Sequence, residues 1–206
     1  MSLTVALSKG RLAQSAEALF RRARLPFPEG NGRLLVVPLD GLRFLFVKDR
    51  DVPVYVEHGV ADCGIAGIDV LRENPGDVYE PLDLGFGLCR LAVARLAGSG
   101  FDPARAGSIR VATKYPRIAS RYFLEHGISA EIVTLSGSVE LAPGLGLADC
   151  IVDVVETGRT LEENGLEVVS EIVSSSARLV VNPASFHARS EEVQRLIEAL
   201  RGAIEK

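Results

Sequence analysis

The stretch DVVETGRTLEENG, residues 153–165, predicts the end of a strand, a turn and a short helix. The apolar run CIVDVV, residues 150–155, is typical of a buried strand, and the polar residues follow directly after it. A buried strand that leads into a helix is the repeating unit of α/β folds. This stretch therefore indicates both the fold class and one end of a sheet where polar side chains gather.

The same alternation continues on both sides of this stretch. Apolar, β-rich runs recur along the chain with helical patterns between several of them, and residues 193–204 carry the clearest helical spacing of apolar residues. Residues 86–108 hold a strand pattern and then a Gly-, Ala-, Ser- and Pro-rich connection. We predict two α/β lobes with largely parallel sheets and flanking helices. Ligands favour domain interfaces and the carboxyl ends of parallel strands, so we expect a cleft between the lobes.

Composition excludes several classes of protein. The chain has 206 residues, of which 47% are hydrophobic and 24% charged, and its net charge is −4. This balance is ordinary for a globular protein and gives no sign of a nucleic-acid-binding or membrane-bound protein. The N-terminus lacks the layout of a secretory signal, and the three cysteines lie far apart as expected for buried free thiols. We expect a cytoplasmic location.

The turn after the strand predicts an anion site. Thr157, Gly158, Arg159 and Thr160 lead into the helix, where backbone N–H groups point outward together and the helix dipole adds to them. Gly158 lets the backbone approach a ligand closely because it has no Cβ. Two threonine hydroxyls and one guanidinium complete a cradle for a phosphate.

A phosphate does not explain the two acids beside this turn, because carboxylates repel it. Asp153 and Glu156 instead suit sugar hydroxyls or a Mg²⁺ ion. A phosphorylated ribose would satisfy the whole stretch, with its phosphate in the turn and its hydroxyls on the acids. The alternative is a surface turn with a threonine N-cap and acids in a first helical turn, and the spacing does not decide between the two.

Other common sites find less support. The sequence has no GxxxxGK[ST] loop, and GLGLAD, residues 144–149, precedes a strand where a dinucleotide-binding fingerprint would follow one. The three histidines show neither metal-ligand spacing nor an arguable Ser-His-Asp arrangement.

Five segments together resemble ATP phosphoribosyltransferase, the enzyme that opens histidine biosynthesis. They are LSKGRL, DVPVYVEHGVADCGIAGIDVL, VATKYP, LSGSVELAP and GLADCIVDVVETGRTLEENGL, and they occur in this order between about residue 5 and residue 173. The segment DVVETGRT is similar to the family's loop for 5-phosphoribosyl 1-diphosphate (PRPP). The resemblance implies attack of adenine N1 of ATP on C1 of PRPP, with release of pyrophosphate.

The resemblance also implies an architecture and partners. The family fold is similar to that of periplasmic solute-binding proteins of type II, with lobe I at residues 1–88 plus 174–206 and lobe II, which carries the PRPP loop, at residues 89–173. The length resembles the short form of the family. Short forms work with a regulatory subunit related to histidyl-tRNA synthetase, so we expect a homodimer within a hetero-oligomer.

The reaction that the resemblance implies needs cations near the diphosphate. We assign this catalytic role to four residues that follow strands, Lys9, Arg11, Lys48 and Arg50. Gly10, between the first two, could meet a phosphate chain at a helix N-terminus. The alternative is a solvated helix start for Lys9 and Arg11, and a charged surface loop for Lys48 and Arg50.

Further substrate contacts are expected in three segments. Asp69 could bind a base or a hydroxyl, although helix capping also explains it. In LSGSVELAP the candidates are Ser136, Gly137, Ser138 and Glu140, for substrate hydroxyls, phosphate, ribose or metal. The segment TKYP, residues 113–116, predicts a helix cap with Pro near the first turn, while Lys114 could also face the cleft. Family members often carry a basic residue where this chain has Leu88, and Arg90 lies two residues further on.

We expect Mg²⁺ because both substrates carry polyphosphates, and an ion held mainly by phosphates needs few protein ligands and no dedicated cage. Two other functions stay open at this point. One is a two-lobed receptor for a small molecule, since a fold does not decide a function. The other is a phosphoribosyltransferase with another acceptor base, because the sequence does not indicate which residues contact adenine.

Overall fold

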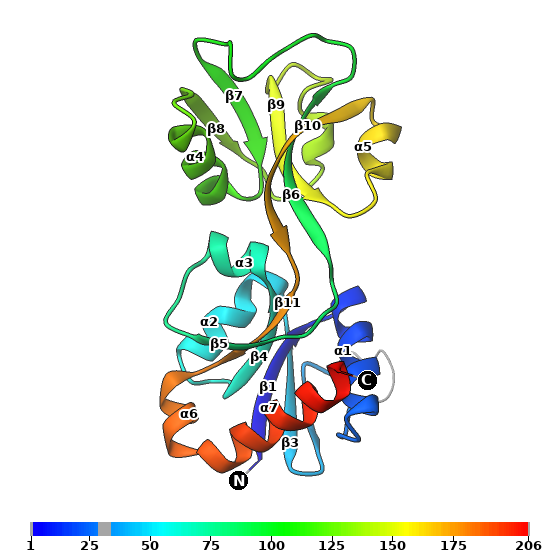
Figure 1. Ribbon diagram of the computed structural model, residues 1–206, viewed down its shortest axis with the longest axis vertical. Helices are drawn as coiled ribbons and strands as arrows, with labels where there is room; N and C mark the ends of the chain where they lie inside the picture. The colour runs from blue at the N-terminus through cyan, green and yellow to red at the C-terminus, as the bar shows by residue number, and fades with distance from the viewer. Residues whose placement is uncertain (1, 29–33, 206) are drawn as a thin grey trace. The chain divides into compact units, whose positions relative to one another are not determined.

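The computed structural model describes residues 2–28 and 34–205. The chain divides into two compact units (Figure 1). The first unit comprises Met1–Leu88 and Ser176–Lys206, and the second comprises Cys89–Ser175. The chain therefore passes between the units twice, once near residue 88 and once near residue 175.

The first unit is built on one mixed sheet. Its strands are β1 (Leu3–Ser8), β2 (Val36–Leu39), β3 (Leu42–Val47), β4 (Cys63–Gly67), β5 (Tyr79–Asp83) and β11 (Ala177–Val181). They lie in the order β2-β3-β1-β4-β11-β5. β1 runs parallel to β3 and β4, whereas β2, β11 and β5 join the sheet by antiparallel pairs.

Helices cover both faces of this sheet because its central strands are apolar on both sides. In β1, Val5 and Leu7 pack in one cluster with α1 (Arg11–Arg22) and α7 (Ser190–Ile204), while Ala6 between them packs in another with α2 (Val52–Glu57) and α3 (Ile68–Glu73). Successive side chains of a strand point to opposite faces, which explains this division. A short helix α6 (Pro183–Ala188) precedes α7, and a 3₁₀ turn η1 (Asp49–Asp51) precedes α2.

The second unit repeats this three-layer plan with its own sheet. Its strands are β6 (Cys89–Leu96), β7 (Ile109–Thr113), β8 (Ala130–Thr134), β9 (Cys150–Val155) and β10 (Leu166–Ser175), in the order β10-β6-β9-β7-β8. On one face, α4 (Pro116–Glu125) buries Phe123 against the strands. On the other, a 3₁₀ turn η2 (Val139–Leu141) and α5 (Arg159–Glu163) bury Val139 and Leu161.

The sheets are mixed, whereas the sequence predicted largely parallel ones. In the second unit, β9 runs parallel to β7 and β7 to β8, but β6 pairs antiparallel with both β9 and β10. The antiparallel pairs of β6 and β11 arise where the chain crosses between units, since each of these strands enters a sheet next to its last parallel strand. The pair of β2 with β3 is instead a local hairpin within the first unit. The strand-helix alternation could not reveal this, because apolar crossing strands have the same composition as parallel ones.

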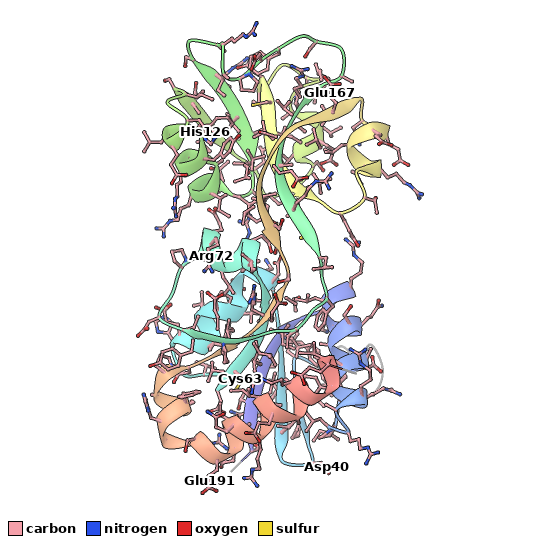
Figure 2. The ribbon with its side chains drawn as sticks, viewed as in Figure 1. Asp40, Cys63, Arg72, His126, Glu167 and Glu191 are labelled. Atoms are coloured by element: carbon pink, nitrogen blue, oxygen red, sulfur yellow. The ribbon has the colours of Figure 1, made fainter. Side chains whose placement is uncertain are left out.

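Two histidines lie at helix ends. His58 is the C-cap residue of α2 and His126 that of α4, where the ring of His126 lies at the surface (Figure 2). None of the helices within the described residues is both long and apolar enough to cross a membrane.

Candidate functional site

The turn after β9 has the local geometry of an anion site. Glu156 and Thr157 are exposed, and Gly158 adopts a left-handed conformation with φ 87° as the N-cap of α5. The backbone N–H of Arg159 donates to Oγ1 of Thr157 over 3.4 Å. α5 has only five residues, so its dipole adds little. The groups that the turn offers to an anion are its amides, the exposed hydroxyls of Thr157 and Thr160, and the exposed Arg159 guanidinium.

Asp153 lies within β9, before the turn, and direct contacts hold its side chain in place. Its side chain is 16% exposed, and its Oδ1 lies 3.1 Å from Nζ of Lys114. The same oxygen accepts a hydrogen bond of 2.8 Å from the backbone N–H of Val154. The sequence left the role of Lys114 between helix capping and the ligand site. The ion pair with Asp153 puts Lys114 beside the predicted PRPP residues.

The segments after β7, β8 and β9 share one edge of the second sheet. Thr113 at the end of β7 is in register with Thr134 at the end of β8 and with Val152 in β9. The loops that follow carry Lys114, the Ser136–Ser138 segment and the β9–α5 turn. Ser138 has φ 50°, a left-handed conformation that is unusual for a residue with a Cβ and that clusters at functional sites. Ser136, Gly137 and Ser138 are exposed, and Glu140 is half-buried in η2.

The first unit gathers its candidate residues at the equivalent edge. Ser8 at the end of β1 is in register with Val47 at the end of β3, and β4 runs parallel beside β1. The residues that follow these strands are Lys9, Gly10 and Arg11 after β1, Lys48 and Arg50 after β3, and Asp69 after β4. The structure thus assembles the predicted residues in two groups, one in each unit.

Within the first group, β1 leads into α1 through a strained turn. Gly10 has φ 97° and ψ −149°, a combination essentially restricted to glycine, and no residue within 4 Å would obstruct a Cβ there. Lys9 is exposed, with Nζ 5.8 Å from the ring centroid of Phe46. Arg11 is the exposed first residue of α1, whose first turn contains no acidic residue. Cations at a helix N-terminus oppose the dipole, so an anionic ligand would favour this arrangement.

The other residues of this group lie in short helical turns. Lys48 is exposed and is the N-cap residue of η1, which contains the half-buried Arg50. Asp69 is half-buried in the first turn of α3. The N-cap of α3 is Gly67, and Asp69 lies in the first helical turn, where a carboxylate is also stabilised by the helix N-terminus.

Leu88 and Arg90 lie at the first crossing between the units. Leu88 is 68% exposed. Arg90 lies in β6 and forms an ion pair with Glu171 of β10, with Nε and Oε1 3.0 Å apart. Arg90 therefore contributes to the pairing of β6 with β10 through this ion pair.

The buried cysteines are unsuited to nucleophilic catalysis. Burial, with a smaller contribution from the Asp62 charge and against the opposing effect of Arg189, raises the pKa of Cys63 to about 12. Burial, together with Asp149, likewise raises the pKa of Cys150 to about 12. Cys63 lies within the core of the first unit (Figure 2). A thiol reacts as its thiolate, so neither of these groups is a nucleophile near neutral pH.

The described part of the chain offers no cluster of side chains that could hold a metal ion without other ligands. Among residues 2–28 and 34–205, no group of three or more His, Cys, Asp or Glu side chains is arranged to hold a metal ion. Asp153 and Glu156 are the two carboxylates that precede the β9–α5 turn, and Glu162 follows it in the first turn of α5. One or two carboxylates suffice for Mg²⁺ when phosphates and water complete its coordination.

Comparison with known proteins points to one family. A sequence model described as ATP phosphoribosyltransferase matches residues 48–202. The chain is 51% identical to the ATP phosphoribosyltransferase of Anaeromyxobacter sp. (strain K), over 98% of this chain and 93% of the relative. It is 50% identical to that of Geobacillus kaustophilus, over 98% of both chains.

Solved structures agree with these relatives. A chain of the ATP phosphoribosyl transferase (HisG:HisZ) complex from Thermotoga maritima is 37% identical, with a TM-score of 0.87 over 98% of both chains. The periplasmic aliphatic sulphonate binding protein SsuA from Escherichia coli is 11% identical, with a TM-score of 0.64 over 98% of this chain and 68% of SsuA. At that identity the likeness concerns the fold alone, and it confirms the predicted periplasmic-binding-protein-like fold.

Proposed function

This chain belongs to the ATP phosphoribosyltransferase family, and from that premise we propose that it transfers the 5-phosphoribosyl group of PRPP to N1 of the adenine of ATP. The reaction releases pyrophosphate and is the first step of histidine biosynthesis. The observation that carries the proposal is the β9–α5 turn, where hydroxyls and a left-handed glycine follow two carboxylates. It lies in a chain that is 51% identical to a named member of the family.

The chemistry requires alignment more than proton transfer. Adenine N1 already has a free lone pair, so no general base is needed to create the nucleophile. As the bond from C1 of the ribose to the diphosphate breaks, positive charge develops on the ribose and negative charge on the leaving group. The protein must therefore hold N1 in line with C1 and supply cations to the diphosphate.

We assign the ribose-5-phosphate to the edge of the second unit. The amides of residues 157–160, with the hydroxyls of Thr157 and Thr160 and the Arg159 guanidinium, suit the 5-phosphate. Asp153 and Glu156 suit the ribose hydroxyls, since a carboxylate can accept hydrogen bonds from two neighbouring ones. We assign the exposed Ser136–Ser138 segment and Glu140 to further substrate contacts at the same edge.

We assign the charge of the polyphosphates to the edge of the first unit. Lys9 and Arg11 flank Gly10 at the start of α1, and Lys48 and Arg50 follow the neighbouring strand. Cations in such positions stabilise a departing diphosphate as it gathers charge. Asp69, in the first turn of α3, is a candidate for a hydroxyl or an adenine amino group.

We propose Mg²⁺ as the cofactor, bound mainly through substrate phosphates. Two carboxylates precede the phosphate turn, and the described residues contain no group of three or more ligands arranged as a cage, which suits an ion that keeps its waters and phosphate ligands. Asp153 or Glu156 would supply a protein ligand. When bound, the ion would neutralise part of the diphosphate charge.

A regulatory partner follows from the comparison. The similar Thermotoga maritima structure is a HisG:HisZ complex. We infer that this chain also works with a HisZ-type regulatory subunit in a hetero-oligomer. We assign it to the cytoplasm, where PRPP and ATP are made.

The test combines turnover with binding. Purified protein, with and without a HisZ-type subunit, should release pyrophosphate only when PRPP, ATP and Mg²⁺ are all present. Thr157→Ala and Thr160→Ala should each weaken PRPP binding about 10-fold in calorimetry, since each removes a hydrogen bond to a charged group. Ser120→Ala, which removes an exposed hydroxyl from α4 of the same unit, is the matched control. Unchanged PRPP affinity in both threonine variants would refute the assignment of the turn.

A further inference from the structure

The ion pair between Lys114 and Asp153 joins two strands of the second sheet at their carboxyl ends. Lys114 follows the last residue of β7, and Asp153 lies in the neighbouring parallel strand β9. Nζ and Oδ1 are 3.1 Å apart, and the side chains are 32% and 16% exposed. Both groups are thus partly removed from water, where an ion pair is stronger than at an open surface.

The backbone on each side of this pair is anchored by a buried threonine. Thr113 is fully buried, and its hydroxyl donates to the carbonyl oxygen of Val152 over 2.6 Å. The same hydroxyl accepts a 2.8 Å hydrogen bond from the backbone N–H of Tyr115. Val152 directly precedes Asp153, and Thr113 and Tyr115 flank Lys114. One side chain therefore fixes the two backbone segments from which the ion pair extends.

The contacts of Asp153 are unequal between its two oxygens. Oδ1 lies against Lys114 and also accepts from the backbone N–H of Val154 over 2.8 Å. Both of these contacts are made by Oδ1 and neither is made by Oδ2. These contacts fix the rotation of the carboxylate and leave Oδ2 able to accept from a ligand hydroxyl.

The ligand assigned to this edge is negatively charged, so the negative charge of Asp153 would disfavour its binding. PRPP is a polyanion, and an unpaired carboxylate beside it would repel its 5-phosphate and its diphosphate. We propose that Lys114 is a positioning residue for PRPP, which neutralises Asp153 and holds its Oδ2 toward the ribose hydroxyls. This inference rests on the function proposed above, since it needs a ribose phosphate at the β9–α5 turn.

Binding of PRPP to four proteins tests the inference: wild type, Lys114→Met, Asp153→Asn and the double variant. Methionine keeps an unbranched, flexible stem beside the buried Tyr115 ring, which lies 5.8 Å from Nζ. Lys114→Met should weaken PRPP binding about 10-fold while KM for ATP changes little. In the Asp153→Asn background, the same substitution should have less than about a twofold effect, because the charge that Lys114 neutralises is gone.

A second pair of variants separates positioning from a general structural role. Lys114→Arg keeps the cation and should restore most of the PRPP affinity, whereas Lys114→Gln should not. Arg121→Gln is the matched control, since it removes an exposed cation that pairs with Glu125 within α4. A loss of thermal stability in Lys114→Met with unchanged PRPP affinity would overturn the inference.

The remaining outcomes are also decisive. Additive effects of Lys114→Met and Asp153→Asn would overturn the positioning role, since Lys114 would then act on PRPP independently, as a phosphate ligand does. Wild-type protein that neither binds nor consumes PRPP would refute the proposed function itself. Wild type that binds PRPP, together with a Lys114→Met variant that binds it equally well, would refute the role of Lys114 alone.

Discussion

The two units share one strand topology but present different chemistry at the same edge. The first unit has the order β3-β1-β4-β11-β5 beside its extra strand β2, and the second has β8-β7-β9-β6-β10. β1, β3 and β4 thus correspond to β7, β8 and β9, and a crossing strand follows antiparallel in each sheet. The first edge carries mainly lysine and arginine, and the second carries carboxylates with hydroxyls. Backbone topology therefore decides where the side chains gather, and side-chain identity decides what they bind.

The correspondence extends to the opposite ends of the strands. β4 and β9 both begin after Ala-Asp, with Asp62 before Cys63 and Asp149 before Cys150. Each aspartate accepts a 2.7 Å hydrogen bond from a backbone N–H of the neighbouring strand, from Thr4 in one unit and from Arg110 in the other. Each also donates its own N–H to the carbonyl of the same residue. The two units thus share a structural device at one end and differ in function at the other.

The largest expected effect is on the free energy of unfolding, and it differs between substitutions of Asp62 and Asp149. Asp62 also accepts from Ser185 and forms an ion pair with Arg189, and the two charged side chains are 13% and 20% exposed. Asp62→Ala should lower the free energy of unfolding by about 3 kcal/mol, because it leaves Arg189 without this partner. Asp149→Ala should cost about 1 kcal/mol, since Asp149 and Arg110 are 36% and 47% exposed. Urea unfolding followed by circular dichroism measures both, and equal losses would contradict the asymmetry.

The next effect concerns the cationic edge. Arg11→Ala should lower kcat about 100-fold, or about 2.7 kcal/mol, because the diphosphate gathers charge in the transition state. Thr160→Ala in the second unit should instead act mainly on KM for PRPP. Steady-state kinetics with pyrophosphate detection separates the two patterns. Arg22→Ala, at the exposed far end of α1, is the control. A loss of PRPP affinity alone in Arg11→Ala would reverse the assignment of the two edges.

The smallest effect concerns the two buried thiols, one in each unit. The pKa of Cys63 and that of Cys150 are raised from 9.0 to about 12, chiefly by burial. Between about pH 9 and pH 12 the two thiols stay protonated in the folded chain but lose their protons in the unfolded chain. The free energy of unfolding therefore falls as the pH rises through this range. Below pH 9 the thiols add no pH dependence. Urea unfolding between pH 8 and pH 10.5 should show a shallower decline in Cys63→Ala and in Cys150→Ala than in wild type.

Much of the candidate site could be predicted from local sequence. The β9–α5 turn was predicted because a buried strand, a glycine and two threonines follow one another within a few residues. α7 was predicted because its apolar spacing is regular, and Val193, Leu196, Ile197 and Leu200 are buried in the first core. These features depend on residues that are close in the chain, where propensity and periodicity are informative.

The features that were not predicted depend on residues far apart in the chain. The antiparallel pairs of β6 and β11 depend on where the chain crosses between units. The Lys114–Asp153 pair depends on the register of β7 against β9. The equivalence of the two Ala-Asp-Cys segments becomes visible only when the strand topologies of the two units are compared. Lys114, two residues before Pro116, was the one local signal, since a cation there opposes the dipole of α4 unless a carboxylate or an anion lies nearby.

By itself, the sequence determined the α/β class, the positions of the turns and the residue types at the strand ends, because these follow from the chemistry of neighbouring residues. Tertiary structure alone decided which strand ends share an edge and which charges meet there. Parallel pairing brought Thr113 beside Val152, and through them Lys114 beside Asp153, across 39 positions of chain. Such contacts depend on sheet register, and register is determined by the packing of two faces at once, which no short stretch of sequence contains.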